Sequence, residues 1–490
     1  MPAEAVPVTR VLQLRPDPTR VIAKAFIAGQ EDVGPTGTRA RLVIERVMAL
    51  TDDQVDQTLD DVITRFATRH RGLLSLLDHQ ACLITGTSAG STSISASRRL
   101  LIGAYFTHEY AVEAAALANP SMVPHPVQDV EGAIKFVMSV RGIGEGHRSS
   151  IGFRTGSVSV DGRIWVDATG PYAEMGRGTP GTQNRGIFLT RLTELGHDPA
   201  QVRALMDALA PTFSEDELRQ AAERLGQAST MPLAPTLIRD AMELSRWSYR
   251  VSFPDDTEVS ERLLWPHAPP EYHGMEDARF TRFTDDDGTV TYLATYTAFD
   301  RNDITLQILK TTEFQHFASA PVDGAAALGK GMALFPRRVN GQFAALTRCD
   351  RESNGLAMSD DLHHWETTTT FQTANEPWES VQLGNCGPPI ELDEGWLVLT
   401  HGVGPMRTYS IGALLLDLAD PTTVIARSHL PVLTPQPLHR DGYVPNVVYS
   451  CGAMRNGDIL VLPYGVADQS IEIATLSISA LLDAMTPTGG

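Results

Sequence analysis

The segment Tyr272–Phe280 (YHGMEDARF) holds the side chains of this sequence that are best suited to acid–base chemistry. Two acids and a base, Glu276, Asp277 and Arg279, stand within four residues and follow Gly274. The protonation state of a carboxyl group depends on its burial and on neighbouring charges, so an acid beside an arginine can be tuned as a proton donor. A surface turn with an ion pair is the alternative, because structural ion pairs also shift pKa values.

Glu276 and Asp277 are neighbours in the chain, and a β-rich run, Val290–Ala298, follows them. Successive side chains of a strand point to opposite faces. We therefore predict that these two carboxyl groups do not form an acid–base pair. The glycine-rich segment Gly142–Gly146 (GIGEG) lies between two strand-like runs without a helix after it, so it predicts a hairpin turn and no dinucleotide site.

The 490 residues contain 59 acids and 40 lysines plus arginines, a formal net charge of −19. This balance argues against a general nucleic-acid or anionic-membrane surface, so we expect no nucleic-acid and no membrane partner. Any anion that the protein binds must therefore meet a local cluster of cations. With 42% hydrophobic residues, the chain can bury a sizeable core.

The four cysteines, Cys82, Cys349, Cys386 and Cys451, are scattered along the chain. They have neither the paired spacing of a metal site nor the density of a disulfide framework, so we predict reduced thiols and no metal site. The N-terminus has no apolar signal core, and no apolar run of ~20 residues occurs in the sequence. A cytoplasmic protein is the expectation.

Helical and strand-like periodicities divide the first half of the chain. Residues 40–117 are largely helix-like, and the last predicted helix, over 100–117, ends before Pro120. A second helical segment covers about 188–246. Between the two, the pattern is that of antiparallel strands over 134–141, 149–154 and 162–167.

From residue 248 to the end, short strands alternate with turns. Two units, Lys310–Phe317 and Met358–Trp365, each follow a strand and end in an aromatic residue. Such a repeat is typical of the outer corner of a propeller blade. The predicted strands of this part are Thr291–Thr297, Thr305–Leu309, Met332–Phe335, Phe343–Thr347, Leu356–Met358, Gly395–Thr400, Tyr409–Leu416 and Ile459–Pro463.

Several short motifs stand in order along this β-rich part. They are Glu276–Arg279 (EDAR), Leu334–Pro336 (LFP), Gly395–Leu397 (GWL), His401–Val403 (HGV), Leu415–Pro421 (LLDLADP), Pro445–Val448 (PNVV) and Pro463–Asp468 (PYGVAD). In these motifs and in their order the chain resembles glycoside hydrolase family 130, which contains mannoside phosphorylases and some β-mannosidases. The resemblance runs from about Asn119 to Leu482, and Ala278 stands where the family usually has proline.

The resemblance implies a mainly β fold with a five-bladed β-propeller. The catalytic propeller would cover 119–490, with the helical insertion at about 188–246, after a largely helical extension over 1–118. It also implies an inverting phosphorylase that cleaves β-mannosides with inorganic phosphate and releases α-mannose 1-phosphate. Phosphate would be a co-substrate, and no cofactor is expected. The helical additions leave two roles open, which are closure over the acceptor sugar and formation of a homo-oligomer.

The resemblance also assigns roles to single residues. Asp277 is the general acid, which in this family is thought to protonate the glycosidic oxygen through the 3-hydroxyl group of the sugar. Asp441 falls where a carboxylate holds the donor sugar. The implied phosphate-binding residues are Lys330, Arg348 and His401. The other candidates for substrate binding are Asn119, Arg141, Arg279, Tyr272 and His273, and for the last two a structural role is the alternative.

The chemistry of the two possible nucleophiles, water and phosphate, agrees with this assignment. An inverting hydrolase needs an acid and a base about 6.5–9.5 Å apart, with water between the base and the sugar. Phosphate is already an anion and needs cations that hold it, so one acid facing lysine, arginine and histidine favours phosphorolysis. A β-mannosidase that uses Glu391 or Asp441 as second carboxylate is one alternative. A non-catalytic glycan-binding propeller is the other, because fold does not determine function.

Overall fold

The computed structural model describes residues 6–26, 39–86, 94–227, 233–300 and 303–488. They belong to two compact units. The first unit comprises Met1–Pro16, Ala115–Thr169 and Met175–Gly490, and the second comprises Asp17–Ala114 and Gly170–Glu174. No helix within the described ranges is long and apolar enough to cross a bilayer.

In its described residues, the second unit consists of four helices and one antiparallel pair of strands, which the helical segment connects. Helix α2 (Asp52–Phe66) begins after Thr51, whose hydroxyl group and the side chain of Gln54 form a reciprocal capping box. The other elements are α1 (Arg39–Met48), α3 (Leu73–Thr85), α4 (Ala96–Tyr105), β2 (Val21–Ala25) and β3 (Thr107–Ala111). Its core consists of Val47, Val55, Ala81, Leu101, Ile102 and Phe106.

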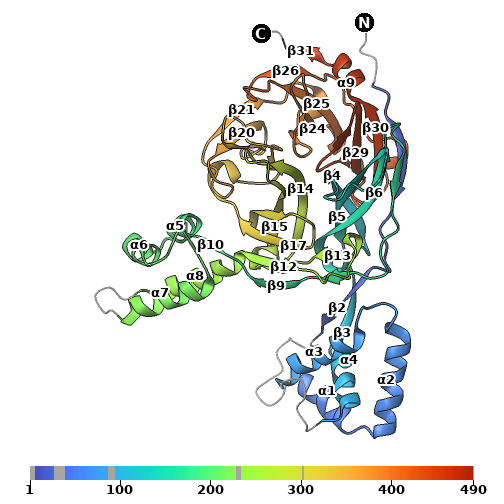
Figure 1. Cartoon of the computed structure of the whole chain (residues 1–490), viewed down its shortest axis with the longest axis vertical. Coiled ribbons are helices and arrows are strands. Elements are labelled where there is room, and N and C mark those ends of the chain that lie inside the picture. The colour runs from blue at the N-terminus through green and yellow to red at the C-terminus, as the bar shows by residue number, and fades with distance from the viewer. Residues whose placement is uncertain (1–5, 27–38, 87–93, 228–232, 301–302, 489–490) are drawn as a thin grey trace. The chain divides into compact units, whose positions relative to one another are not determined.

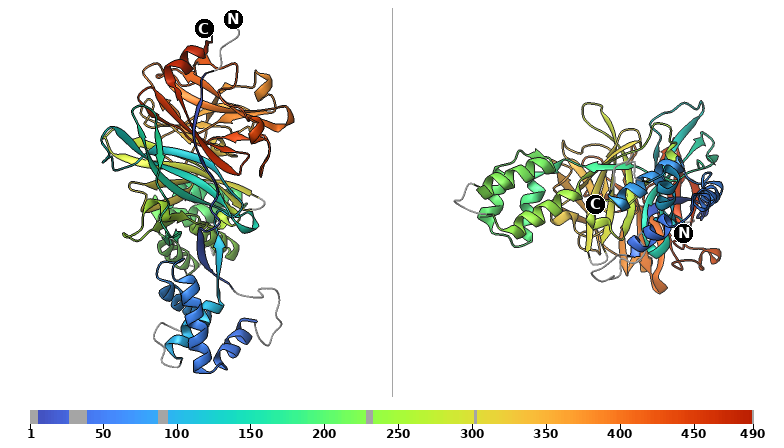
Figure 2. Two further views of the ribbon diagram at one scale, coloured as in Figure 1. Left: turned by 90° about the vertical axis from the view of Figure 1, so that its right-hand side faces the viewer. Right: turned by 90° about the horizontal axis from the view of Figure 1, so that it is seen from below.

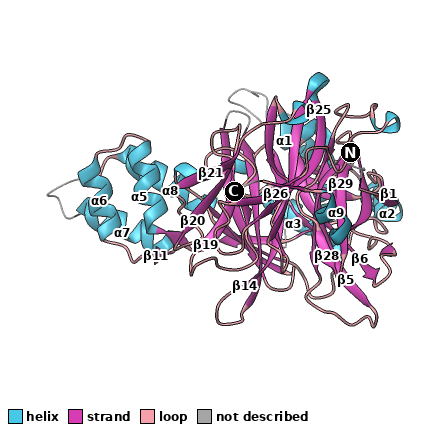
Figure 3. Ribbon diagram, turned by 90° about the horizontal axis from the view of Figure 1, so that it is seen from above, coloured by secondary structure: helices cyan, strands magenta, loops and turns pink. Residues whose placement is uncertain are grey.

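The first unit is mainly β, and strands make up most of it in Figure 3. Its larger strands form five antiparallel groups. Figure 1 shows them side by side, from teal through yellow to red. The first group is β4 (Ala116–Pro124), β5 (Ala133–Ile143), β6 (Ser149–Ser159) and β7 (Ile164–Val166). The second group is β14 (Gly274–Thr284), β15 (Val290–Asp300), β16 (Asp303–Thr311) and β17 (His316–Pro321).

The remaining groups are separate sheets. The third is β18 (Ala333–Leu334), β19 (Phe343–Thr347), β20 (Asn354–Ser359) and β21 (Thr368–Gln372). The fourth is β22 (Gln382–Asn385), β23 (Ile390–Glu391), β24 (Trp396–Gly404), β25 (Thr408–Leu416), β26 (Val424–Arg427) and β31 (Thr486–Pro487). The fifth is β1 (Thr9–Leu14), β27 (Val448–Tyr449), β28 (Met454–Asn456), β29 (Ile459–Val466) and β30 (Ser470–Ser477), followed by α9 (Ile478–Ala484).

The first two groups are joined into one 12-stranded sheet by a parallel pairing of Ser149 in β6 with Gly274 in β14. An isolated parallel bridge between Ser121 and Gly452 links the first group to the fifth. Residues 144–148 connect β5 and β6, so the glycine-rich segment 142–146 lies at the end of β5 and in the hairpin turn that it predicts. Strands such as β4 and β24 are buried along nearly their whole length, because both of their faces pack against other parts of the fold.

The boundary between the two units differs from the predicted one at 118/119. β1 pairs antiparallel with β30, so residues 9–14 complete the C-terminal sheet and do not belong to the helical part. Figure 2 shows this blue strand along the red sheet. Cross-strand hydrogen bonds bind β1 to a partner more than 450 residues away, a contact that local sequence patterns do not contain.

The helix predicted over 100–117 is wrong beyond its first turns. α4 ends at Tyr105, and the alanine-rich residues after it form β3 and the start of β4. Helix propensity is a weak preference that tertiary contacts override. Here the two strands find partners in β2 and β5, and Ala116, Leu117 and Ala118 become fully buried.

The helical insertion consists of α5 (Arg185–Glu194), α6 (Pro199–Asp207), α7 (Glu215–Gln227) and α8 (Pro235–Leu244). It has its own apolar core, which includes Phe188, Leu205 and Leu237. Figure 1 shows it as a group of helices beyond β9 (Arg177–Pro180) and β12 (Tyr249–Ser252), which pair antiparallel at its base. The smaller strands of this region are β8 (Glu174–Met175), β10 (Gln183–Asn184), β11 (Thr212–Phe213) and β13 (Arg262–Leu264).

Candidate active site

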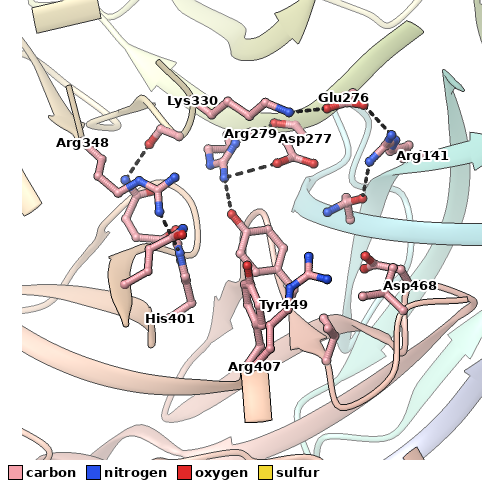
Figure 4. A pocket seen from close by; sticks show the side chains of 17 residues that line it. Arg141, Glu276, Asp277, Arg279, Lys330, Arg348, His401, Arg407, Tyr449 and Asp468 are labelled. Atoms are coloured by element: carbon pink, nitrogen blue, oxygen red, sulfur yellow. Dashed lines mark hydrogen bonds and ion pairs between the residues drawn. The ribbon is translucent and has the colours of Figure 1, made fainter. Parts of the chain in front are cut away.

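A cavity of about 250 Å³ is lined by residues that lie in, or close to the ends of, strands of all five groups. It brings together Asp277, Lys330, Arg348 and His401, which lie in different motifs of the sequence. Asn119, Arg141 and Arg279 line the same cavity. Figure 4 shows these side chains pointing toward one another from separate strands and loops.

Asp277 lies on a β-bulge of strand β14. The pairing of β14 with β15 shifts between Glu276 and Arg279, and Asp277 has φ of 55°. The side chain of Arg279 holds this bulge, because its Nη1 donates to the backbone oxygen of Asp277 at 2.9 Å. Its Nη2 donates to the hydroxyl group of Tyr449 at 2.7 Å and lies 3.9 Å from Asp277 Oδ2. A buried arginine thus fixes the carboxyl group in the cavity.

The bulge overturns the prediction that Glu276 and Asp277 face opposite sides. Both side chains line the same cavity. Strict alternation holds only for a regular strand, and the extra residue of a bulge redirects the side chains next to it. Two cations hold the carboxylate of Glu276, which supports the prediction that it does not form an acid–base pair with Asp277.

Asn119 occupies a similar bulge in β4, where the pairing with β5 shifts between Ala118 and Ser121. Its φ is 48°. Eleven non-glycine residues of the described chain have positive φ, and four of them, Asn119, Asp277, Arg407 and Asp468, line this cavity. Such conformations cost free energy and concentrate at sites where function constrains the backbone. Their clustering here favours this cavity as the candidate functional site.

Glu276 is the centre of an ionic chain along one wall. Its Oε1 accepts from Arg141 Nη2 and its Oε2 from Lys330 Nζ, each at 2.6 Å. Arg141 Nη1 also lies 3.5 Å from Asn119 Oδ1. In Figure 4 this chain runs along the top of the pocket, with Arg407 and Asp468 below it. Lys330 therefore contributes its charge to the cavity while its position is set by a carboxylate.

Arg348 and His401 form a second wall. Burial and the neighbouring charge of Arg348 lower the pKa of His401 to about 3, so the imidazole is neutral. Its Nδ1 lies 3.1 Å from the carbonyl oxygen of Asn385 and must carry the proton, which leaves Nε2 to accept from Arg348 Nη1 at 3.4 Å. In this geometry His401 Nε2 orients Arg348, and the predicted contact of His401 with phosphate stays a prediction.

The close approach of these two side chains depends on Gly384. A Cβ atom at this position would lie 2.5 Å from His401 Cε1 and 3.0 Å from Arg348 Cδ. The amide oxygen of Gln382, once the amide is turned, accepts from the Arg348 guanidinium as well. Strand β22 therefore shapes and orients this wall.

The cavity is positive although the protein is acidic. Its lining residues include five cations, Arg141, Arg279, Lys330, Arg348 and Arg407, and three acids, Glu276, Asp277 and Asp468. The net charge of the whole chain is −19. A local excess of two positive charges in a recessed site attracts an anion that the rest of the surface repels. This is the local cation cluster that the composition required for any anion binding.

Asp468 is the acidic lining residue that the sequence analysis did not select. It lies in the turn between β29 and β30, where Ala467 and Asp468 have φ of 50° and 47°. Burial raises the pKa of this carboxyl group to about 6, against the opposing effect of Arg141. The motif Pro463–Asp468 ends on this residue and is a local sequence signal for it. The position of the Asp468 side chain in the cavity, however, depends on the conformation of the turn.

Asp468→Asn is expected to stabilise the protein at pH 8 and to do so less at pH 4.5. The folded-state pKa of Asp468, about 6, lies above the ordinary value of 3.8, so folding disfavours the charged form. Stability should rise as the pH falls through 6, because the folded protein then takes up a proton that the unfolded chain does not yet bind. We expect the variant to unfold about 2 °C higher at pH 8 by calorimetry. A shift that is equal at both pH values would contradict this.

Four residues that the sequence analysis considered do not line this cavity. Tyr272 and His273 precede the first residue of β14, and the side chain of Tyr272 is 62% exposed. Asp441 is exposed, because its loop turns Val444 and Val447 to the cavity instead. Glu391 binds the guanidinium of Arg337 at 2.7 Å in another pocket. Tyr272, His273 and Asp441 thus do not line the described cavity, and their role in substrate binding stays a prediction.

Gln382, Asn385, Arg407, Tyr409 and Tyr449 line the cavity without having been predicted. Arg407 follows Met406 in a short turn, and both have positive φ. Tyr449 directly follows the motif Pro445–Val448, and this neighbourhood is the feature of the sequence that points to Tyr449 as a site residue. No group of three or more potential metal ligands among His, Cys, Asp and Glu occurs within the described ranges.

Comparison with known proteins gives a consistent result. A family profile described as beta-1,4-mannooligosaccharide phosphorylase matches residues 254–487. Beta-1,2-mannobiose phosphorylase of Listeria innocua is 30% identical over 318 residues, 60% of this chain and 86% of that protein. Beta-1,2-mannobiose phosphorylase of Thermoanaerobacter sp. is 33% identical over 218 residues, 44% of this chain and 70% of that protein. A solved structure of the Listeria innocua enzyme with beta-1,2-mannobiose has a TM-score of 0.44 at 21% identity and covers 76% of this chain and 92% of that one.

Proposed function

Since the chain belongs to glycoside hydrolase family 130 and is an enzyme of the glycoside phosphorylase type, we propose that it cleaves β-mannosides with inorganic phosphate and releases α-mannose 1-phosphate. The five antiparallel groups of strands are the blades of a propeller in this proposal, and the cavity at Asp277 is its active site. Phosphate is a co-substrate, no cofactor takes part, and a cytoplasmic location remains a prediction.

In the proposed reaction, a phosphate oxygen attacks the anomeric carbon from the face opposite to the leaving sugar. The bond between this carbon and the glycosidic oxygen breaks, and its electron pair stays on the oxygen. The 3-hydroxyl group of the donor sugar gives its proton to that oxygen and takes the proton of Asp277. The products are α-mannose 1-phosphate and a sugar with a new free hydroxyl group, so the anomeric configuration is inverted.

The observation that carries this proposal is that Asp277 shares one cavity with Lys330, Arg348 and Arg407. Arg348 is oriented by neutral His401 and not by a carboxylate, so its charge is available to an incoming anion. A guanidinium group binds phosphate bidentately and places its oxygens in a defined direction. Since phosphate brings its own negative charge, the site needs cations and no general base.

Cleavage is expected to depend on phosphate. Purified protein incubated with β-1,2- or β-1,4-mannobiose should release a sugar phosphate in the presence of about 10 mM phosphate, a concentration above the usual range of KM values. Without phosphate, release of mannose should fall to the background of the assay. Chromatography and ³¹P NMR would identify the product and its α-configuration. Release of free mannose at a rate that ignores phosphate would contradict the proposal.

Neither of the two bases named for the hydrolytic alternative, Glu391 and Asp441, lines the described cavity. Among the carboxylates that line the described cavity, Glu276 is held by Arg141 and Lys330. Asp468 would therefore have to activate water. In a phosphate-free reaction, loss of mannose release in Asp468→Asn would favour hydrolysis.

A further inference from the structure

A second hollow, of about 330 Å³, lies at the other end of strands that line the cavity at Asp277. In β4, Asn119 lines that cavity, whereas residues 122–124 at the end of the strand line the hollow. In β14, Asp277 lines the cavity, whereas Arg282 and Thr284 line the hollow. The two share no lining residue, and the catalytic chemistry described above makes no use of the hollow.

The wall of the hollow is largely apolar. Five apolar side chains and four prolines contribute to it, which are Met122, Val123, Phe280, Ile390, Met454, Pro124, Pro336, Pro388 and Pro389. Proline has no backbone N–H group, so this wall offers few hydrogen-bond donors to a ligand. Sites for small organic molecules are typically hollows of about 300–1,000 Å³ with apolar walls and a few polar groups. The size and the lining of this hollow therefore suit the apolar body of a small molecule.

The charged residues of the hollow carry an excess of positive charge. Arg282, Arg337 and Arg455 line it together with one acid, Glu391. Arg337 neutralises this acid, because its Nη2 donates to Oε1 of Glu391 at 2.7 Å and its Nε donates to Oε2 at 3.1 Å. Two positive charges remain, in a chain whose net charge is −19. Such a local excess attracts an anion.

The two remaining charges belong to Arg282 and Arg455. Within the part of the chain that the structure describes, neither of them forms an ion pair with an acid. Each is bonded to the rim of the hollow, since Arg282 Nη1 donates to Thr284 Oγ1 at 3.5 Å and Arg455 Nη1 donates to the carbonyl oxygen of Glu391 at 2.8 Å. Arg282 also bonds to the hydroxyl group of Tyr292. A guanidinium group has several further N–H donors, so both side chains can bind an anion at the rim.

We propose that this hollow binds a small organic anion with an apolar body, a carboxylate or a phosphate monoester, whose anionic group lies between Arg282 and Arg455. The body packs against the prolines and aliphatic side chains, which removes apolar surface from water. The anionic group accepts charge-assisted hydrogen bonds from the two guanidinium groups. A neutral apolar ligand would leave these bonds unmade, and a fully polar anion would gain nothing from the wall.

Calorimetric titration of the full chain with naphthalene-2-carboxylate tests the site. We expect binding to a single site with a dissociation constant below about 1 mM. Naphthalene-2-carboxamide has the same body without the charge and should bind at least about tenfold more weakly. Acetate has the charge without the body and should show no binding. Naphthalen-2-yl phosphate, titrated into the Arg348→Met variant, reports whether the site prefers a phosphate or a carboxylate group, and tighter binding of either one supports the proposal.

Substitution of the two arginines locates the binding site. Arg282→Met and Arg455→Met should each weaken binding of naphthalene-2-carboxylate by about tenfold or more, the effect of losing a charge-assisted hydrogen bond. Both side chains are exposed, so the variants should fold like the parent. Arg224→Met is the matched control, because Arg224 is exposed on α7 and lines neither the cavity at Asp277 nor the hollow. Arg348→Met should also leave the affinity unchanged.

Three results would refute the proposal. They are no binding of naphthalene-2-carboxylate at about 5 mM, equal affinity for the carboxamide, and an affinity that survives both Arg282→Met and Arg455→Met. Loss of binding in Arg348→Met would place the ligand in the cavity at Asp277 and would refute the proposal as well. Binding is measured without a mannoside, so none of these results depends on the proposed function.

Discussion

Asp277→Asn is expected to lower kcat/KM for phosphorolysis of mannobiose by about 10³-fold, within the range for loss of a general acid. The amide has nearly the same shape as the carboxyl group but cannot give a proton to the leaving oxygen. The bulge should persist, because Arg279 bonds to the backbone oxygen of Asp277 and not to its side chain at short range. Initial rates of sugar phosphate formation would measure the effect.

A substrate whose leaving group needs no proton gives the sharper version of this test. With 2,4-dinitrophenyl β-mannoside, the same variant should lose no more than about tenfold, since the dinitrophenolate leaves without an acid. Asp286→Asn is the matched control, as this carboxylate is exposed in the turn between β14 and β15 and does not line the cavity. Equal losses with both substrates would show that Asp277 holds the sugar and does not supply the proton.

Arg348→Met is expected to raise KM for phosphate by about 100-fold and to leave KM for the mannoside within a few fold. A charge-assisted hydrogen bond contributes roughly 1.5–3 kcal/mol, and about 2.7 kcal/mol corresponds to that factor. Met fills similar volume beside His401 without the charge. Arg348→Lys should recover part of the affinity, because lysine keeps the charge but not the bidentate geometry. Steady-state kinetics with phosphate varied at saturating mannoside would give both constants.

Arg337→Met provides the matched control for the loss of an arginine. This side chain pairs with Glu391 in a different pocket, so its removal should not change KM for phosphate. The reverse pattern, in which Arg348→Met weakens mannoside binding and leaves phosphate binding intact, would move the phosphate site away from Arg348. Arg407 would then be the next candidate, since it lines the same cavity from the other side.

Local sequence patterns anticipated most of the strands near the site. The run 134–141 lies within β5, and Phe343–Thr347 coincides with β19. The patterns were wrong after residue 105, where they predicted that the helix continues to 117 and the structure has β3 and the start of β4. Short apolar or alanine-rich runs fit a helix or a buried strand equally well until their pairing partners are known.

The composition of the cavity was anticipated in part. Order and identity of the motifs pointed to Asp277, Lys330 and Arg348, and the fold brings these three together. The neutral state of His401 was not foreseen, because it results from burial and from the charge of Arg348, which outweigh the opposing effect of the hydrogen bond to the carbonyl group of Asn385. Asp468 was missed for a related reason, since its place in the wall depends on a turn with positive φ.

The sequence by itself determined which residue types could do the chemistry. It also determined the net charge of −19, which required a local cluster of cations, and the family resemblance that the order of the motifs implied. Only the tertiary structure decided which of these side chains share a cavity. Bulges at Asn119 and Asp277 turn their side chains inward, and strand pairing brings β1 to the far end of the chain. The physical reason is that residue type is a local property, whereas register, bulge geometry and burial arise from partners that are distant in the sequence.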